Sequence, residues 1–194
     1  TVVLTNNLVV STKTYSGADR ICVYHNASSD ASFYFRNNTV VFSSRPASHV
    51  SYGVQLDGDQ SKLYLDNNLF YYSASSAPVP DTCFIYESTA VAPEQFRNND
   101  FSYSNEAPIF YHDSSGDLTS IGDLNGETPD NNGSANISIN PQIDLENFEP
   151  TVNTPTEVLV GGLTGNATLE WGFGRDRRGN NRTSSDTTDW TIGC

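Results

Sequence analysis

The chain has 194 residues, three cysteines, no methionine and a formal net charge of −13. An acidic excess of this size repels phosphate backbones, so we expect no nucleic acid partner. No apolar run reaches the ~20 residues of a membrane-spanning helix, so we also expect no membrane insertion. Aromatic residues make up 11% of the chain, which argues against disorder. The abundant Asn, Ser, Thr, Asp and Gly favour turns over helix interiors.

A short signature recurs along the first half of the chain: an apolar residue, a variable residue and Asn-Asn. The four copies are Leu4–Asn7, Phe35–Asn38, Leu65–Asn68 and Phe96–Asn99. Their first asparagines are separated by steps of 31, 30 and 31 residues. A fixed period of roughly 20–50 residues is typical of stacked repeat architectures rather than of a single globule.

Each signature sits between two predicted strands. Apolar and polar residues alternate before each Asn-Asn, as in a strand with one buried face. The alternation predicts a continuous interior stack of Phe35, Leu65 and Phe96. Asparagine tolerates the left-handed backbone conformation, so Asn-Asn predicts a bend before the second strand. Because buried amides need partners, we expect one asparagine of each pair to form a hydrogen-bonded ladder from repeat to repeat.

A third strand is predicted in each repeat, at 21–24, 52–56 and 82–86. Equivalent strands would pair in parallel at roughly 4.8 Å spacing. This alignment places Cys22, Gly53 and Cys83 in one column. The two cysteines would then be roughly 9–10 Å apart, whereas a disulfide needs Cα atoms within about 7 Å. We therefore expect two free thiols, unless Cys194 folds back onto one of them.

The asparagine bends and apolar columns of residues 1–112 resemble the right-handed parallel β-helix of the pectin-lyase-like superfamily. The fold class that this implies is all-β: a right-handed parallel β-helix, or solenoid, with three short strands per coil and an irregular C-terminal cap. An antiparallel sandwich with coincidental Asn-Asn pairs is the alternative. The resemblance does not specify a function, because this fold hosts lyases, hydrolases, epimerases, phage tailspikes and adhesins.

The C-terminal part resembles the end of secreted bacterial β-helix proteins, which implies a secreted or cell-surface location. The resemblance rests on Asn140-Pro141, Gly161-Gly162, the segment 176–182 and Ile192-Gly193. Thr191 and Cys194 stand where such proteins have Asp and Ala, so the match is partial. We expect coils over 1–140 and a capping segment of the same domain over 141–194, because a solenoid must cover its last coil. The chain opens in mid-coil, so we expect N-terminal coils to be missing or atypical.

Outward positions of the strand before the bend carry the candidate ligand-binding residues. Arg36, Asp66 and Arg97 form one predicted column, and Tyr34 and Tyr64 lie beside it on the same face. Aromatic and charged hydrogen-bonding groups suit the rings, hydroxyls and carboxylates of sugars. These five residues are therefore the candidate carbohydrate site. The alternative interpretation is a solvated salt-bridge ladder, in which each pair contributes well under ~1 kcal/mol.

No catalytic residue is recognisable, because the sequence does not give the separations of its many carboxylates. The segment 113–130 offers oxygen ligands for calcium but lacks the spacing of an EF-hand, so acidic turns are favoured and no cofactor is assigned. The cysteine spacing matches no zinc site.

The sequence favours a non-catalytic secreted or surface module with a polysaccharide as its candidate partner. One alternative is a polysaccharide lyase or glycoside hydrolase whose site lies partly outside this chain. Another is a structural part of an adhesin or tailspike, which would form an oligomer.

Overall fold

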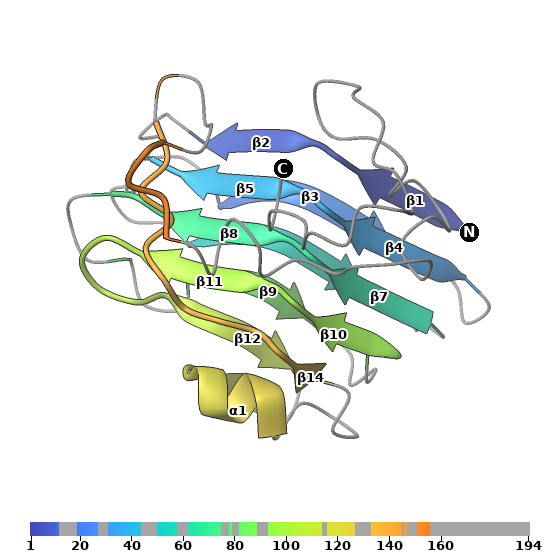
Figure 1. Ribbon diagram of the computed structural model, residues 1–194. Coiled ribbons are helices and arrows are strands. Elements are labelled where there is room, and N and C mark those ends of the chain that lie inside the picture. The colour runs from blue at the N-terminus through green and yellow to red at the C-terminus, as the bar shows by residue number, and fades with distance from the viewer. Residues whose placement is uncertain are drawn as a thin grey trace, which may run out of the picture.

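Three β-sheets account for nearly all of the regular structure in the computed structural model (Figure 1). The first sheet contains β1 (Val2–Thr5), β4 (Ser32–Arg36), β7 (Lys62–Asp66), β10 (Gln95–Arg97) and β14 (Gly133–Ser134). The second contains β2 (Leu8–Ser11), β5 (Thr39–Phe42), β8 (Leu69–Tyr72) and β11 (Asp100–Tyr103). The third contains β3 (Arg20–Asn26), β6 (Ser51–Asp57), β9 (Cys83–Glu87), β12 (Ile109–Asp113) and β13 (Gly116–Leu118). A short helix, α1, spans Ile121–Gly126.

The structure describes residues 1–11, 19–26, 31–43, 50–57, 62–74, 78, 82–88, 93–113, 116–126, 133–144, 146 and 151–155. Within these residues, no helix is long and apolar enough to cross a membrane. The segment 176–182 and Cys194 lie outside them, as does most of the expected cap over 141–194.

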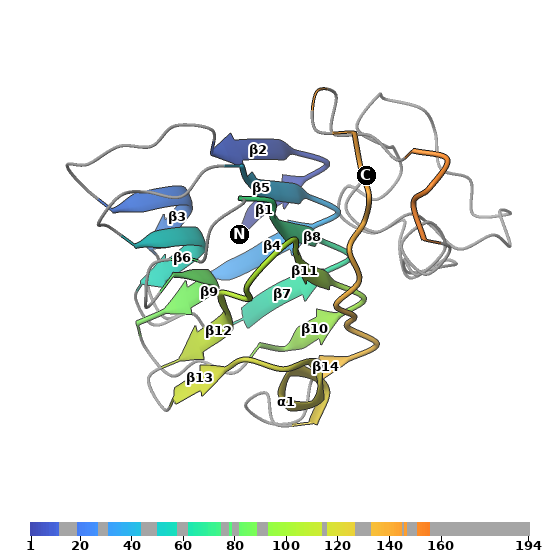
Figure 2. The same ribbon diagram turned by 90° about the vertical axis from the view of Figure 1, so that its left-hand side faces the viewer.

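From β1 to β12 the chain visits the three sheets in a fixed order, so that each round adds one strand to every sheet, whereas β13 folds back on β12 before β14 extends the first sheet. The strands therefore progress from β1, β2 and β3 at one end to α1 and β14 at the other (Figure 2). All pairings between named strands are parallel except that of β12 with β13. Parallel, in-register pairing confirms the three strands per repeat that the sequence predicts and excludes the antiparallel sandwich.

The predicted interior stack is confirmed. Phe35 pairs with Leu65 and Leu65 with Phe96, and each side chain is at most 1% exposed. The second strands add a matching column, in which the rings of Phe70 and Phe101 stack with centroids 5.0 Å apart. These residues belong to one apolar cluster that lies between the sheets.

Both asparagine columns form ladders. The first asparagines of the four signatures have φ values of 54–58°, in the left-handed region that the bend requires. Among the second asparagines, Asn68 Oδ1 accepts both the backbone N–H and the Nδ2–H of Asn38, at 3.0 and 3.2 Å. Asn68 Nδ2 in turn donates to Asn99 Oδ1 and to the carbonyl of Phe35, both at 2.9 Å. Each internal asparagine thus satisfies the donors and acceptors of its side-chain amide by hydrogen bonds to the two neighbouring repeats.

The ladder extends beyond the four signatures, which the sequence analysis did not predict. Asn99 Nδ2 donates to Asn136 Oδ1 at 2.9 Å, and Asn136 Nδ2 donates to Asn125 Oδ1 at 2.9 Å. Asn136 belongs to a degenerate fifth copy, in which Ala135 takes the left-handed bend position with a φ of 53°. Asn125 belongs to α1, so the helix ends the ladder. Leu124 of the same helix is fully buried in the core.

The predicted column of Cys22, Gly53 and Cys83 is wrong by one residue. The register pairs Tyr52 with Cys83, which places Phe84 opposite Gly53. A Cβ on Gly53 would lie 2.5 Å from the carbonyl oxygen of Phe84, so the close approach of β6 and β9 requires glycine here. The absence of a disulfide between Cys22 and Cys83 is nevertheless confirmed.

The segment on both sides of the predicted boundary between coils (1–140) and cap (141–194) packs against the side of the repeats. Ile137 and Ile143 form a second apolar cluster with Val41, Leu69 and Tyr71 on the outer face of the second sheet. This layer hides one sheet face and leaves the outer faces of the first and third sheets as the candidate binding surfaces.

We predict that Asn68→Ala lowers the free energy of unfolding by roughly 3 kcal/mol, because it leaves several buried donors and acceptors without partners. Asn7→Ala is the matched control, since Asn7 is exposed at the end of the same ladder. It should cost less than about 1 kcal/mol. Urea unfolding measures both values, and equal losses would contradict a ladder that acts mainly through its buried members.

Candidate functional site

All five predicted ligand-binding residues lie on the outer face of the first sheet. Strands β4, β7 and β10 place Tyr34 beside Tyr64, and Asp66 between Arg36 and Arg97. The pairing therefore brings the predicted residues together in two adjacent columns. Gln95, which the sequence analysis did not single out, continues the tyrosine column one repeat further.

The charged column is a buried network rather than the solvated ladder that the alternative interpretation assumed. Asp66 is fully buried and Arg36 is 6% exposed. The Nε atoms of Arg36 and Arg97 lie 3.0 and 3.3 Å from the two carboxylate oxygens of Asp66. Gln95 Oε1 accepts hydrogen bonds from Nη2 of both arginines, at 3.1 and 3.0 Å. Two long arginine side chains flank the short carboxylate of Asp66. The aligned sequence shows the alternation of charges but not the burial that results.

Burial and charge act in opposite directions on the ionisable groups of the Arg36–Asp66–Arg97 network. Burial raises the pKa of Asp66, and the charges of Arg36 and Arg97 act against that rise. Burial also lowers the pKa of the Arg36 guanidinium. Within the described residues, the network of two arginines and one aspartate carries a net positive charge, and the exposed Glu94 is a nearby acidic group beside Tyr64. Because the Arg97 side chain is 31% exposed, it is the member of the network that presents this charge to solvent.

The tyrosine pair forms the other half of the surface. The rings of Tyr34 and Tyr64 stack with centroids 4.3 Å apart and an interplanar angle of 7°. The guanidinium carbon of Arg36 lies 4.8 and 5.4 Å from the two ring centroids, within cation–π range. Mutual stacking covers one face of each ring. On their other sides, the neighbours in the same column are Val3 for Tyr34 and Gln95 for Tyr64. The pair therefore offers its ring edges and hydroxyls to a ligand.

A second aromatic column, on the third sheet, was missed by the sequence analysis. Tyr86 stacks on Tyr52 and on His112, with centroids 4.6 and 4.8 Å apart. Nδ1 of His112 lies 2.6 Å from Asp117 Oδ1. No described serine, threonine or cysteine side chain hydrogen-bonds to His112, so this pair does not form a nucleophile–base arrangement. The recurrence of planar polar residues near the end of each third strand was the only available signal.

Asp100 is a buried carboxyl on the outer face of the second sheet. Its Oδ1 accepts the backbone N–H of Ile139 at 3.0 Å, and no described donor reaches its Oδ2. Burial raises the pKa of Asp100 well above its usual range. Asp100 thus ties the segment after β14 to the sheet, and its environment favours the protonated acid.

Metal ligation has no support within the described residues, where no three His, Cys, Asp or Glu side chains are placed to hold an ion. Asp117 pairs with His112, and Asp123 exchanges hydrogen bonds with Ser120 at the start of α1. Asp59 and Asp130 lie outside the described residues. Calcium binding to 113–130 stays the alternative to the acidic turns that the sequence favours.

Comparison of the chain with known protein families, curated proteins and solved structures found no match.

We predict that Asp66→Asn lowers the free energy of unfolding by about 3 kcal/mol, because Arg36 is then buried without a counter-charge. Asp117→Asn removes an exposed partner of His112 and should cost less than about 1 kcal/mol. Chemical denaturation at neutral pH compares the two. A small loss for Asp66→Asn would show that the buried pair is not a structural requirement.

Asp100 gives a pH prediction. Its folded-state pKa is raised, so its stabilising contribution is complete below the unfolded value, near pH 4, and is lost as the pH rises through the folded value. Asp100→Asn cannot ionise and keeps an acceptor for Ile139. The stability of this variant relative to the wild type should therefore increase as the pH is raised above about 4. Parallel denaturation curves across this range, with a constant difference, would contradict the burial of an ionisable group.

Proposed function

We propose that the chain is a right-handed parallel β-helix of the pectin-lyase-like kind, acting as a non-catalytic secreted or surface module that binds polysaccharide. The strand order supports the fold proposal, since each round adds one parallel strand to each of three sheets. Connections between parallel strands of one sheet are almost always right-handed, which supports the handedness.

The observation that carries the binding proposal is the stacked tyrosine pair beside a guanidinium network on an exposed sheet face. Tyr34 and Tyr64 supply ring edges and hydroxyls. Arg97 supplies N–H donors and positive charge at the surface. These groups match sugar rings and hydroxyls, and the charge of Arg97 suits a sugar carboxylate.

The remaining members of the network act as positioning residues. Asp66 orients both guanidiniums, and Gln95 bridges their outer nitrogens. Because these contacts are made within the protein, the surface is arranged before any ligand arrives. A pre-arranged surface loses less conformational entropy on binding.

A glycan array that includes neutral and carboxylated polysaccharides tests the proposal, followed by titration calorimetry on any hit. We expect binding that Tyr64→Ala weakens by about tenfold or more. Tyr24→Ala is the matched control, because Tyr24 is 55% exposed on a different sheet, and it should leave affinity unchanged. Equal weakening by both variants, or no glycan binding at all, would contradict the assignment.

The same array run with calcium and with a chelator separates the alternatives. The proposal expects equal binding in both conditions and no shortening of the polysaccharide. Release of cleaved products would identify a lyase or hydrolase and overturn the non-catalytic function.

A further inference from the structure

The end of the molecule formed by β1, β2 and β3 differs from the opposite end in that nothing in the described chain closes it. We propose that this end binds one further layer of polypeptide, a strand–Asn-Asn–strand segment that runs parallel to β1 and β2 and donates its asparagine amide to Asn7. The proposal concerns assembly and is independent of carbohydrate binding.

All three sheets present an unpaired edge at this end. In the sheet orders, β1, β2 and β3 are terminal strands, each paired on one side only within the described residues. The three edges lie at the same end of the molecule (Figure 1, Figure 2). Exposed edges of this kind template the pairing of another chain.

Apolar exposure is concentrated on the same strands. Four of the five exposed large hydrophobic residues in the described chain belong to β1 and β3: Val2, Val3, Ile21 and Tyr24. Val2 is 39% exposed, whereas Phe33, its partner one repeat further, is fully buried. Phe33 has a paired strand on both sides, β1 and β7, whereas Val2 has a described neighbour only on the β4 side.

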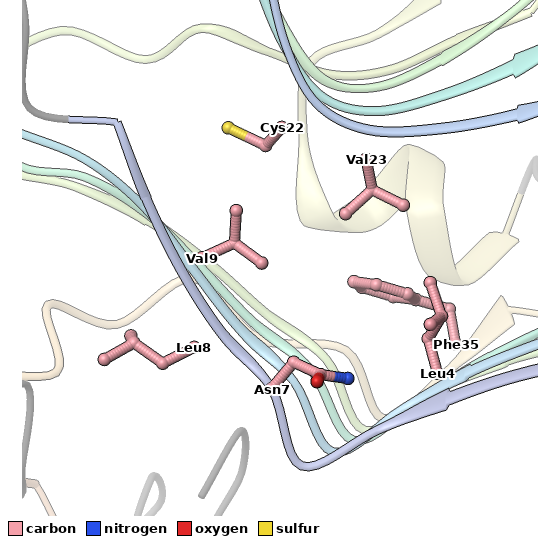
Figure 3. A pocket seen from close by; sticks show the side chains of 7 residues that line it. All are labelled: Leu4, Asn7, Leu8, Val9, Cys22, Val23 and Phe35. Carbon is pink, nitrogen blue, oxygen red and sulfur yellow. The ribbon is translucent and has the colours of Figure 1, made fainter.

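The interior is open at this end as well. A cavity of about 340 Å³ enters the apolar core there, lined by Leu4, Asn7, Leu8, Val9, Cys22, Val23 and Phe35 (Figure 3). Val9, Val23 and Phe35 point into the space between the sheets, whereas Leu8 lies on the other side of β2 (Figure 3). An apolar chain segment suits this cavity better than water does.

The hydrogen bonds of the ladder specify what a further layer must donate. Each internal second asparagine accepts a backbone N–H and an Nδ2–H from the repeat before it, as Asn68 does from Asn38. Asn7 donates to Asn38 and to the carbonyl of Thr5, and its own Oδ1 accepts from no described residue. The complement is therefore an asparagine at the bend of a parallel layer.

A second copy of the chain does not supply this donor. A second copy joined through its identical end offers its own Asn7, whose Nδ2 already donates to Asn38 Oδ1 and to the carbonyl of Thr5. The opposite end is closed, because Asn125 of α1 accepts the last amide of the ladder and Leu124 fills the core. Because neither end of a second copy supplies a donor for Asn7 Oδ1, we favour a separate strand segment over self-association.

A fusion tests the proposal on the whole chain. A copy of residues 32–61 placed directly before Thr1 keeps the register, because Thr1 precedes Val2 as Ser32 precedes Phe33, and Ser32 pairs with Lys62. Cys22 lines the cavity and reports on its closure. Burial already raises the pKa of this thiol to about 11, so alkylation is followed at one alkaline pH, and the modified cysteine is identified by peptide mass.

We expect the added layer to slow alkylation of Cys22 at least tenfold, and to bring the β1 and β2 amides under protection from hydrogen exchange. The control fusion carries Asn38→Leu in the added copy, which removes the amide that meets Asn7 and should restore most of the reactivity. The unfused chain should sediment as a monomer at all concentrations tested. Unchanged Cys22 reactivity, equal protection by both fusions, or a dimer of the unfused chain with Cys22 protected would each overturn the proposal.

Discussion

The need to satisfy buried asparagine amides is the constraint on which the rest of the structure depends. Asn38, Asn68 and Asn99 are fully buried, and an unpaired amide in such a place is costly. The only abundant partner is the same amide one repeat away. The ladder therefore fixes the register of the two strands that flank every bend, and apolar columns follow from that register.

The strand register that the ladder fixes also sets the positions of the side chains on the outer face of the first sheet. Asp66 directly precedes the Asn67-Asn68 bend, so the ladder also fixes the position of its carboxylate relative to Arg36 and Arg97. The resulting network is buried and internally paired. We attribute the candidate binding surface to the groups this network leaves accessible, chiefly the tyrosine pair and Arg97.

The features nearest the bend were predictable from sequence, because a period of about thirty residues is conserved there in residue type and in spacing. The interior stack of Phe35, Leu65 and Phe96 and the asparagine ladder belong to this group. The third sheet was predictable only in part. Its strands follow segments of unequal length, so the period measured at the bend misplaced Cys83 by one position.

Other features depend on tertiary contacts that an alignment of the repeats does not reveal. The burial of Asp66 arises from the length and direction of two arginine side chains, and the fifth repeat has lost its apolar residue and its first asparagine. The role of Asn125 in ending the ladder requires a helix that the repeat pattern does not predict. The aromatic column joins Tyr86 and His112, which are register partners, to Tyr52, which is offset from Tyr86 along the paired strands.

Hydrogen exchange of the asparagine side-chain amides, followed by nuclear magnetic resonance, tests the central claim most directly. The account predicts slow exchange for the Nδ2 protons of Asn38, Asn68, Asn99 and Asn136, and fast exchange for those of Asn7. Fast exchange at all five residues, under conditions where the backbone amides of β5 and β8 remain protected, would contradict a ladder that holds the repeats in register.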